Sequence, residues 1–471
     1  MKRFWLVLLS LGLPVAFSAS AMAVDVKFSG DFTIGGMYLD KTKLVKDTSG
    51  DGPSTAFYFQ RLRVRTDFII SPGLKLITRF DAMERIWGGA RSSPGTYDTQ
   101  SAGTMAENEN IAFDWAYIEY TTPIGLFQVG YAEDNVWGTV FGSSGSGPSS
   151  GQILYGAQIG PVSFGAALYK ETDGSHSAVH PTYATDTDYD RYALFGIYNF
   201  KDGETGLAFS YSRIANDKQT PSSLTPGLGA WGVPLNMGGS YIPFANIMYI
   251  YTLSSYAKVK LGPVKLEAQV IYAWGSINLE NGVSGYDVQL QDIMAYLNAV
   301  VDLGPFYFGG TAAYMSGDNG ENGDRVKGNV LGGGMDWNPC LIMFNQDLTY
   351  WVGPINGYSG TSNFSGSYPN TGYAGMTNAW FGQLKAGVRP IPKLDINAAV
   401  SYAQADQVPT GWVSNSYGWE VDLIGTYKIT NNLSYMLGVG YLFTGDYYKG
   451  TSNFNQLNND YMVINKLTLT F

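Results

Sequence analysis

Six basic residues lie at even spacings within two consecutive segments of the sequence: Arg61, Arg63, Arg65, Lys75, Arg79 and Arg85. Alternate residues of a β-strand point to the same side, so each segment, read as a strand, presents its basic residues on one face. Like charges on one face repel each other, and only Asp67 and Asp81 lie among them as acids. The pattern favours a wall that steers ions in water; a face of salt-bridged pairs is the alternative.

Acidic and aromatic residues occur together in the segment 125–151, which reads GLFQVGYAEDNVWGTVFGSSGSGPSSG. A short strand is predicted first, then Glu133, Asp134, Trp137 and Phe141, then a flexible run of Gly and Ser. We expect the two carboxylates to face the basic wall. The alternative is an ordinary surface loop, in which Trp137 and Phe141 only anchor the chain.

The segments that must position these residues alternate apolar and polar side chains. In residues 56–70, apolar Leu62, Val64, Phe68 and Ile70 alternate with the arginines. The same alternation recurs in residues 74–87, 264–274, 393–402 and 433–443, whereas residues 110–121 do not sort into two faces. A charge facing lipid near the middle of a membrane costs about 2–4 kcal/mol. In a membrane, therefore, the charged faces must point towards water, and we expect a water-filled interior instead of a packed core.

The composition agrees with strands whose two faces contact different solvents. The chain has 34 Tyr, 24 Phe, 11 Trp and 59 Gly, and only 14% of its residues are charged. Aromatic girdles at both membrane surfaces are typical of membrane β-barrels. Cys340 is the single cysteine, which excludes a disulfide framework. The acidic balance without a basic tail argues against nucleic acid as a partner.

Short turns alternate with long polar loops along the chain. Nine turns marked by Pro, Gly, Asn or Asp are predicted at residues 71–73, 123–125, 160–161, 201–204, 261–263, 303–305, 337–339, 390–393 and 430–432. Nine turns and ten long loops imply about 20 strands, with 16 or 18 as alternatives. The predicted fold class is all-β: a transmembrane antiparallel up-and-down β-barrel with short periplasmic turns and long extracellular loops.

The N-terminal residues have the layout of a secretory signal peptide. Lys2 and Arg3 precede an apolar run, and Ala21-Met22-Ala23 is a small-residue cleavage site. We predict that residues 1–23 are removed and that residues 24–471 form one barrel domain. Loss of Lys2 and Arg3 takes the formal charge from −10 to −12.

The last segment, residues 461–471, reads YMVINKLTLTF. Its alternation assigns Leu467, Leu469 and Phe471 to lipid and Lys466 to water, while Asn465 departs from the pattern. An apolar strand ending in an aromatic residue resembles the closing strand of bacterial outer-membrane barrels, whose last residues act as an assembly signal. We expect this strand to pair with residues 26–38.

The segment 125–151 also resembles the general porins, whose third external loop folds into the barrel and narrows it. The resemblance implies an inward loop at about residues 132–151, with Glu133 and Asp134 opposite the arginines. The runs 59–89 and 116–133 resemble the homotrimeric porins of anaerobic delta-proteobacteria. That resemblance implies a trimer and passive diffusion of small solutes.

Other candidate sites have weaker signals. His176 and His180 lie in a polar loop interrupted by Pro181, so we expect no metal there. The acidic loops 47–52 and 318–324 do not complete a calcium-binding loop. Gly332–Gly334 lacks the lysine of a phosphate loop, and we expect close backbone packing there. The sequence thus predicts no metal, cofactor or catalytic site.

Together these features predict an outer-membrane porin that passes small hydrophilic solutes and ions. The residues expected to line the pore are Arg61, Arg63, Arg65, Lys75, Arg79, Asp81, Arg85, Glu133, Asp134 and Trp137. One alternative is a channel specific for a sugar or organic acid. Another is a barrel that serves as a scaffold for an adhesin or an electron-transfer partner.

Overall fold

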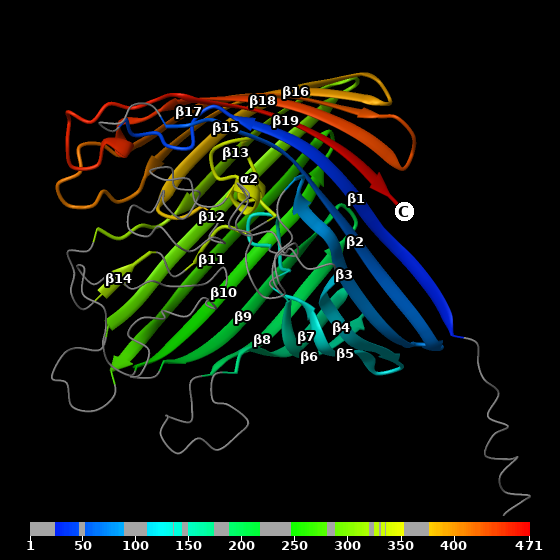
Figure 1. The fold of residues 1–471 in the computed structure, drawn as a ribbon. Coiled ribbons are helices and arrows are strands. Elements are labelled where there is room, and N and C mark those ends of the chain that lie inside the picture. Colours follow the sequence, from blue (N-terminus) through cyan, green and yellow to red (C-terminus); the bar gives the residue numbers. More distant parts are fainter. Residues whose placement is uncertain are drawn as a thin grey trace, which may run out of the picture.

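The computed structural model describes residues 24–46, 52–88, 111–134, 136–143, 149–173, 188–216, 246–279, 288–319, 325–328, 331–334, 336–352 and 376–471. Figure 1 shows a single ring of tilted antiparallel strands, with a short helix, α2, inside it. Within these residues no helix has the length and apolar character of a membrane span.

The strands follow one another around the ring in chain order. They are β1 Asp25–Leu39, β2 Thr55–Ser71, β3 Leu74–Ile86, β4 Ile111–Thr122, β5 Gly125–Glu133, β6 Ser149–Ile159, β7 Val162–Thr172, β8 Tyr189–Phe200, β9 Gly203–Asn216, β10 Asn246–Leu261, β11 Val264–Leu279, β12 Val288–Leu303, β13 Phe306–Met315, β14 Arg325–Lys327, β15 Ala379–Ile391, β16 Leu394–Ala405, β17 Ser416–Lys428, β18 Leu433–Thr444 and β19 Asp460–Thr470. β14 is a three-residue strand that pairs parallel with β12, and the remaining eighteen strands close the barrel. Two short helices, α2 Gln346–Val352 and the 3-10 helix η1 Asp446–Lys449, complete the list.

The barrel confirms the predicted fold class, and it has eighteen strands because one predicted turn does not join two strands. Eight of the nine predicted turns connect neighbouring strands, from 71–74 between β2 and β3 to 428–433 between β17 and β18. The ninth, at residues 337–339, lies between β14 and α2. Pro and Asn mark turns of any kind, so their presence could not distinguish this loop from a hairpin.

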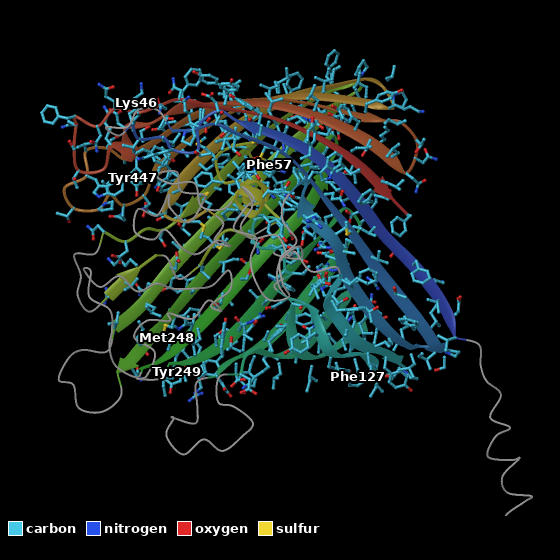
Figure 2. The ribbon with its side chains drawn as sticks, in the orientation of Figure 1. Lys46, Phe57, Phe127, Met248, Tyr249 and Tyr447 are labelled. Atoms are coloured by element: carbon cyan, nitrogen blue, oxygen red, sulfur yellow. The ribbon has the colours of Figure 1, made fainter. Side chains whose placement is uncertain are left out.

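The predicted alternation of outer and inner faces is clear on β18. On β18, Leu437, Val439 and Tyr441 are 48%, 42% and 38% exposed on the outer face, which meets lipid. On β10, consecutive residues face opposite sides: Met248 is buried inside, whereas Tyr249 stacks against Tyr211 on the outside (Figure 2).

The first and last strands pair to close the barrel, as the sequence predicted. β1 and β19 run antiparallel from Asp31 opposite Thr470 to Leu39 opposite Met462. The side-chain amide of Asn465 donates a hydrogen bond to the Gly36 carbonyl across this seam, at 3.4 Å. Asn465, which broke the apolar pattern, thus has a backbone acceptor on the neighbouring strand.

The interior holds a hydrophobic core as well as polar surface, which corrects the expectation of a lumen without packing. Residues 336–352 contribute Met343, Phe344, Leu348 and Trp351, which are nearly inaccessible to solvent. They pack with side chains on the inner face of the wall: Met37, Phe59, Met294, Met315, Phe381, Tyr417 and Met462. The sequence did not predict this segment, because residues 337–339 have the composition of a turn between two strands.

Candidate functional site

The basic face of β2 and β3 is paired with carboxylates. Arg63 donates two hydrogen bonds to Asp81 on the neighbouring strand, Nε to Oδ1 at 2.8 Å and Nη2 to Oδ2 at 2.7 Å. Arg65 pairs with Asp67 at 2.7 Å. Such two-point contacts hold a guanidinium in a fixed orientation.

Asp114 of β4 is an acidic partner of Arg79 that the alternating sequence pattern did not reveal. A register shift between Arg79 and Phe80 places Asp114 as an extra residue of β4, which is why residues 110–121 did not sort into two faces. Its carboxylate accepts a hydrogen bond from Arg79 Nε at 2.8 Å and lies 3.9 Å from Arg63 Nη2. Arg79 also lies over the Trp115 ring, 3.6 Å from its centroid.

The basic and acidic side chains on the inner face of β2, β3 and β4 are equal in number. Five cations contact five carboxylates: Arg61 with Glu84, Arg63 with Asp81, Arg65 with Asp67, Lys75 with Glu119, and Arg79 with Asp114. The sequence identified only Asp67 and Asp81 as acidic neighbours. The wall therefore matches the salt-bridged alternative, and the expectation of a net basic wall is corrected.

Arg85 lies on the opposite face from the one predicted. Met83 has a positive φ of 53°, and the register with β2 shifts between Gln60 and Leu62. The irregularity places Arg85 opposite Gln60 and turns Glu84 inward, towards Arg61. Strict alternation could not anticipate a bulge, so Arg85 is removed from the inner wall.

Residues 136–143, the first inward segment, are attached to the far side of the barrel. The backbone N–H and the hydroxyl of Thr139 both donate to Gln269 Oε1 on β11, at 2.8 and 2.7 Å. Gln269 Nε2 donates in turn to Ser254 Oγ on β10, at 3.2 Å. Trp137 packs against Tyr256 of β10, with ring centroids 5.2 Å apart. The chain thus crosses the lumen from β5 to β10 and β11.

The two acids that precede this segment have different environments. Asp134 is 4% exposed and pairs with Arg191 of β8, which also contacts Glu171 at 2.8 Å. This corrects the expectation that Asp134 faces the arginines of β2. Glu133 is exposed at the end of β5 and interacts electrostatically with Arg79 and Arg65.

Residues 331–334 and 336–352 form a second inward segment. The backbone N–H groups of Ile342 and Met343 each donate to the Glu420 carboxylate on β17, at 2.6 Å. Asn345 caps α2 by accepting a hydrogen bond from the Leu348 N–H at 2.9 Å. At the other end of α2, Trp351 stacks on Phe59 of β2, with ring centroids 4.4 Å apart.

The two inward segments contact each other inside the barrel. Phe141 meets Trp337 edge-to-face at 4.8 Å, and Ser143 Oγ donates to Asp336 Oδ2 at 2.7 Å. A Cβ on Gly334 would lie 2.1 Å from the Ser143 carbonyl oxygen, so only glycine permits this approach. Together the segments form a continuous bar from β2 and β17 on one side to β10 and β11 on the other.

A barrel closed around a narrowed interior is the architecture of a membrane channel, and the sequence comparison identifies the family. The model of the family described as Gram-negative porin matches residues 10–339, which is more than half of the chain. This chain is a Gram-negative porin. Family and fold together make it an outer-membrane channel.

Solved structures share the barrel at low sequence identity. OccK11 (OpdR) of Pseudomonas aeruginosa is 12% identical, with a TM-score of 0.47 over 94% of this chain and 96% of that one. The anion-selective porin of Comamonas acidovorans is 10% identical, with a TM-score of 0.44 over 95% and 100%. OmpT of Vibrio cholerae, solved in a trimer form, is 10% identical, with a TM-score of 0.42 over 95% and 100%. No curated protein matches the chain.

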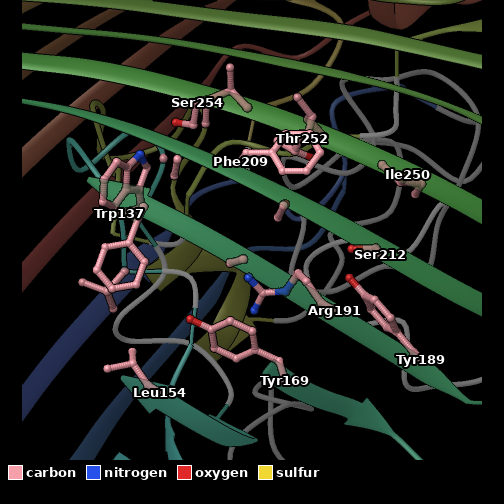
Figure 3. A pocket seen from close by; sticks show the side chains of 18 of the residues that line it. Trp137, Leu154, Tyr169, Tyr189, Arg191, Phe209, Ser212, Ile250, Thr252 and Ser254 are labelled. Carbon is pink, nitrogen blue, oxygen red and sulfur yellow. The ribbon is translucent and has the colours of Figure 1, made fainter. Parts of the chain in front are cut away.

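Two cavities border the bar in this porin. One, of about 290 Å³, lies between the first inward segment and the walls of β8 to β10, and it is lined by Trp137, Tyr169, Tyr189, Arg191, Ser212 and Thr252 among others (Figure 3). Arg191 lies over the Tyr169 ring at 3.8 Å, with both of its acidic partners beside it. The other, of about 330 Å³, is more polar and lies against β11 to β17, where its charged lining includes Glu267, Asp336, Lys385 and Asp422.

Several predicted features lie outside the described residues. These are the signal peptide 1–23, the Gly/Ser run from 144 to 148, His176 and His180. Most of the acidic loop 47–52, and residues 320–324 of the other acidic loop, are outside as well. Asp114, Glu119, Arg191 and Glu420 are site residues that the sequence analysis missed, because their partners lie on other strands.

Proposed function

We propose that solutes pass this porin between the β2–β4 wall and the bar of inward segments. Glu133 supports this route, since it is exposed to water and interacts electrostatically with Arg79 and Arg65 on the wall and with Asp336 on the bar. Water-exposed charge on both sides suits a hydrated passage for small hydrophilic solutes and ions, driven by their own gradients. No cofactor or energy source takes part.

The charge balance favours a weak preference for cations. By formal charge, the five ion pairs of the wall cancel, and the cluster of Asp134, Arg191 and Glu171 has one excess negative charge. Glu133 adds another, while Glu267 and Asp336 outnumber Lys385 in the larger cavity. Charges near a narrow passage raise the local concentration of the opposite ion.

Two measurements test this function. Proteoliposomes containing the porin should swell in neutral sugars at rates that fall with solute size, and empty liposomes should not swell. In a KCl gradient, the reversal potential should take the sign of a cation preference. Absence of size-dependent swelling contradicts diffusion through a narrowed lumen, whereas a reversal potential of anion sign contradicts only the charge balance.

A solute-specific channel is the second candidate, and the 290 Å³ cavity favours it. Aromatic rings and hydroxyl groups line this cavity, a combination that suits the apolar and polar faces of a sugar or an aromatic acid. Saturable flux of one solute, or blockade of the current by it, would support this function over general diffusion.

We also propose that the porin is a homotrimer in the outer membrane, exported by a cleaved signal peptide at residues 1–23. The likeness of the runs 59–89 and 116–133 to the homotrimeric porins of anaerobic delta-proteobacteria supports the assembly. Native mass of the detergent-extracted protein tests it directly: three chains are expected, and a monomer would contradict the proposal.

A further inference from the structure

Three potential metal ligands meet where the second inward segment touches β17. Cys340, Glu420 and Asp422 are 4%, 0% and 2% exposed. Their ligand atoms, the thiol sulfur and one oxygen of each carboxylate, all lie within 4.8 Å of one another. Ligands bound to one zinc ion at about 2.0–2.3 Å have separations compatible with this limit.

Asp422 is the residue of the cluster whose buried carboxylate lacks well-formed hydrogen bonds from the described part of the chain. Both of its carboxylate oxygens are inaccessible to solvent, and neither accepts a well-formed hydrogen bond from any residue that the structure describes. The Leu341 N–H and the Glu420 carboxyl group approach it without reaching that geometry. A buried carboxylate without a well-formed hydrogen bond or a counter-ion is costly, and a bound cation would offset that cost.

The neighbouring groups are arranged around that position. Glu420 accepts two backbone hydrogen bonds, from Ile342 and Met343, which fix its orientation in the way that outer-shell partners fix metal ligands. Gly440 lies opposite Asp422 in β18, and a Cβ there would come within 2.7 Å of Asp422 Oδ1. Glycine therefore leaves room for the carboxylate at this point.

The cluster lies beside a cavity of the lumen. Asp422 forms part of the wall of the 330 Å³ cavity, together with Glu267, Asp336 and a single lysine, Lys385. The acidic lining attracts cations. The thiol favours a transition-metal ion over Ca²⁺ or Mg²⁺, which prefer oxygen ligands alone.

We propose that Cys340, Glu420 and Asp422 bind a divalent transition-metal ion of the zinc class. The ion links the second inward segment, through Cys340, to the barrel wall, through Glu420 and Asp422. It is a structural ion, and solute diffusion does not depend on it chemically. Glu420 and Asp422 lie on one strand, two residues apart, but Cys340 is 80 residues earlier in the sequence, so no ligand spacing revealed the cluster.

Metal titration of the full-length folded porin tests the site. Protein stripped with EDTA and reloaded with Zn²⁺ should retain one ion per chain by elemental analysis after gel filtration. Loading with Co²⁺ should produce a thiolate-to-metal charge-transfer band. Cys340→Ser should abolish this band, and Asp422→Asn should weaken binding by at least the roughly 10–100-fold that loss of an outer-shell partner costs.

Glu267→Gln is the matched control, because Glu267 lines the same cavity without belonging to the cluster. It should bind Zn²⁺ as wild type does, and heat-modifiable gel mobility verifies that every variant folds. Wild-type protein that retains neither Zn²⁺ nor Co²⁺ would overturn the proposal and indicate that the two carboxyl groups share a proton instead. Unchanged binding in folded Asp422→Asn would overturn it as well.

Discussion

Lys466, on the strand that closes the barrel, forms an ion pair with Asp347 in the first turn of α2. The neighbouring residue, Asn465, donates to the Gly36 carbonyl across the seam. The strand thus pairs with β1 along its edge and holds the second inward segment with its inner face. The bar across the lumen is therefore coupled to barrel closure.

The Asp347–Lys466 pair makes the bar sensitive to acid. Burial alone would raise the pKa of Asp347, but the Lys466 ammonium, with a contribution from Arg61, lowers this pKa below its ordinary value. The stabilisation is therefore complete above the unfolded pKa of about 3.9 and is lost as the pH falls through the lowered folded value. We expect single-channel current to be quiet at neutral pH and to fluctuate only below about pH 4.

Asp347→Asn should bring those fluctuations to neutral pH, with a loss of stability of about 0.2–1 kcal/mol because the pair is partly exposed. Asp446→Asn is the control, since Asp446 is 58% exposed and pairs with Lys449 on its own short helix, away from the bar. Equal noise in Asp347→Asn and wild type at neutral pH would contradict this role of the pair.

Unpairing one wall arginine should change ion selectivity. Asp81→Asn leaves Arg63 without its two-point partner and adds one positive charge to a balanced wall. A unit charge about 4 Å from a passing ion is worth about 1 kcal/mol in water, so the permeability ratio should shift towards anions by at most about fivefold. The double variant Arg63→Gln/Asp81→Asn should return the reversal potential to its wild-type value; a shift that persists in it would have another cause than charge.

Releasing the first inward segment should widen the passage. Gln269→Leu removes the acceptor of two hydrogen bonds from Thr139, each contributing about 0.5–1.5 kcal/mol. We expect higher conductance and entry of larger sugars in the swelling assay. Gln158→Leu, at an exposed site near the turn between β6 and β7, should change neither. An unaltered size limit in folded Gln269→Leu would show that this segment does not narrow the passage.

The C-terminal residue should govern assembly. Phe471 exchanges two backbone hydrogen bonds with Gly30, at 2.9 and 3.1 Å, while its ring is 49% exposed towards lipid. If the terminal ring acts with Leu467 and Leu469 as the assembly signal, Phe471→Ala should lower the heat-modifiable fraction although it keeps both bonds. Deleting Phe471 should lower it further. If Phe471→Ala assembles at the wild-type level, the terminal ring is not part of the assembly signal. Any effect of deleting Phe471 would then come from loss of the two backbone hydrogen bonds.

The barrel could be predicted from the sequence because a period of two is a local property of each strand. Leu437, Val439 and Tyr441 display their outward orientation in the sequence itself. The pairing of the wall could not be predicted, since Asp114 and Glu84 reach the lumen through irregularities that break the period, one of them at a positive φ of Met83. Likewise, residues 337–339 have the composition of a turn, and only packing of Trp337 against Phe141 distinguishes an inward segment from a hairpin.

Single-channel recording in planar bilayers tests the central claim, a water-filled passage beside the bar, most directly. Purified porin should insert in discrete ohmic steps, and neutral solutes added in graded sizes should reduce the conductance until they become too large to enter. Gln269→Leu should move that limit to larger solutes. Absence of conductance steps from folded protein would contradict an open channel.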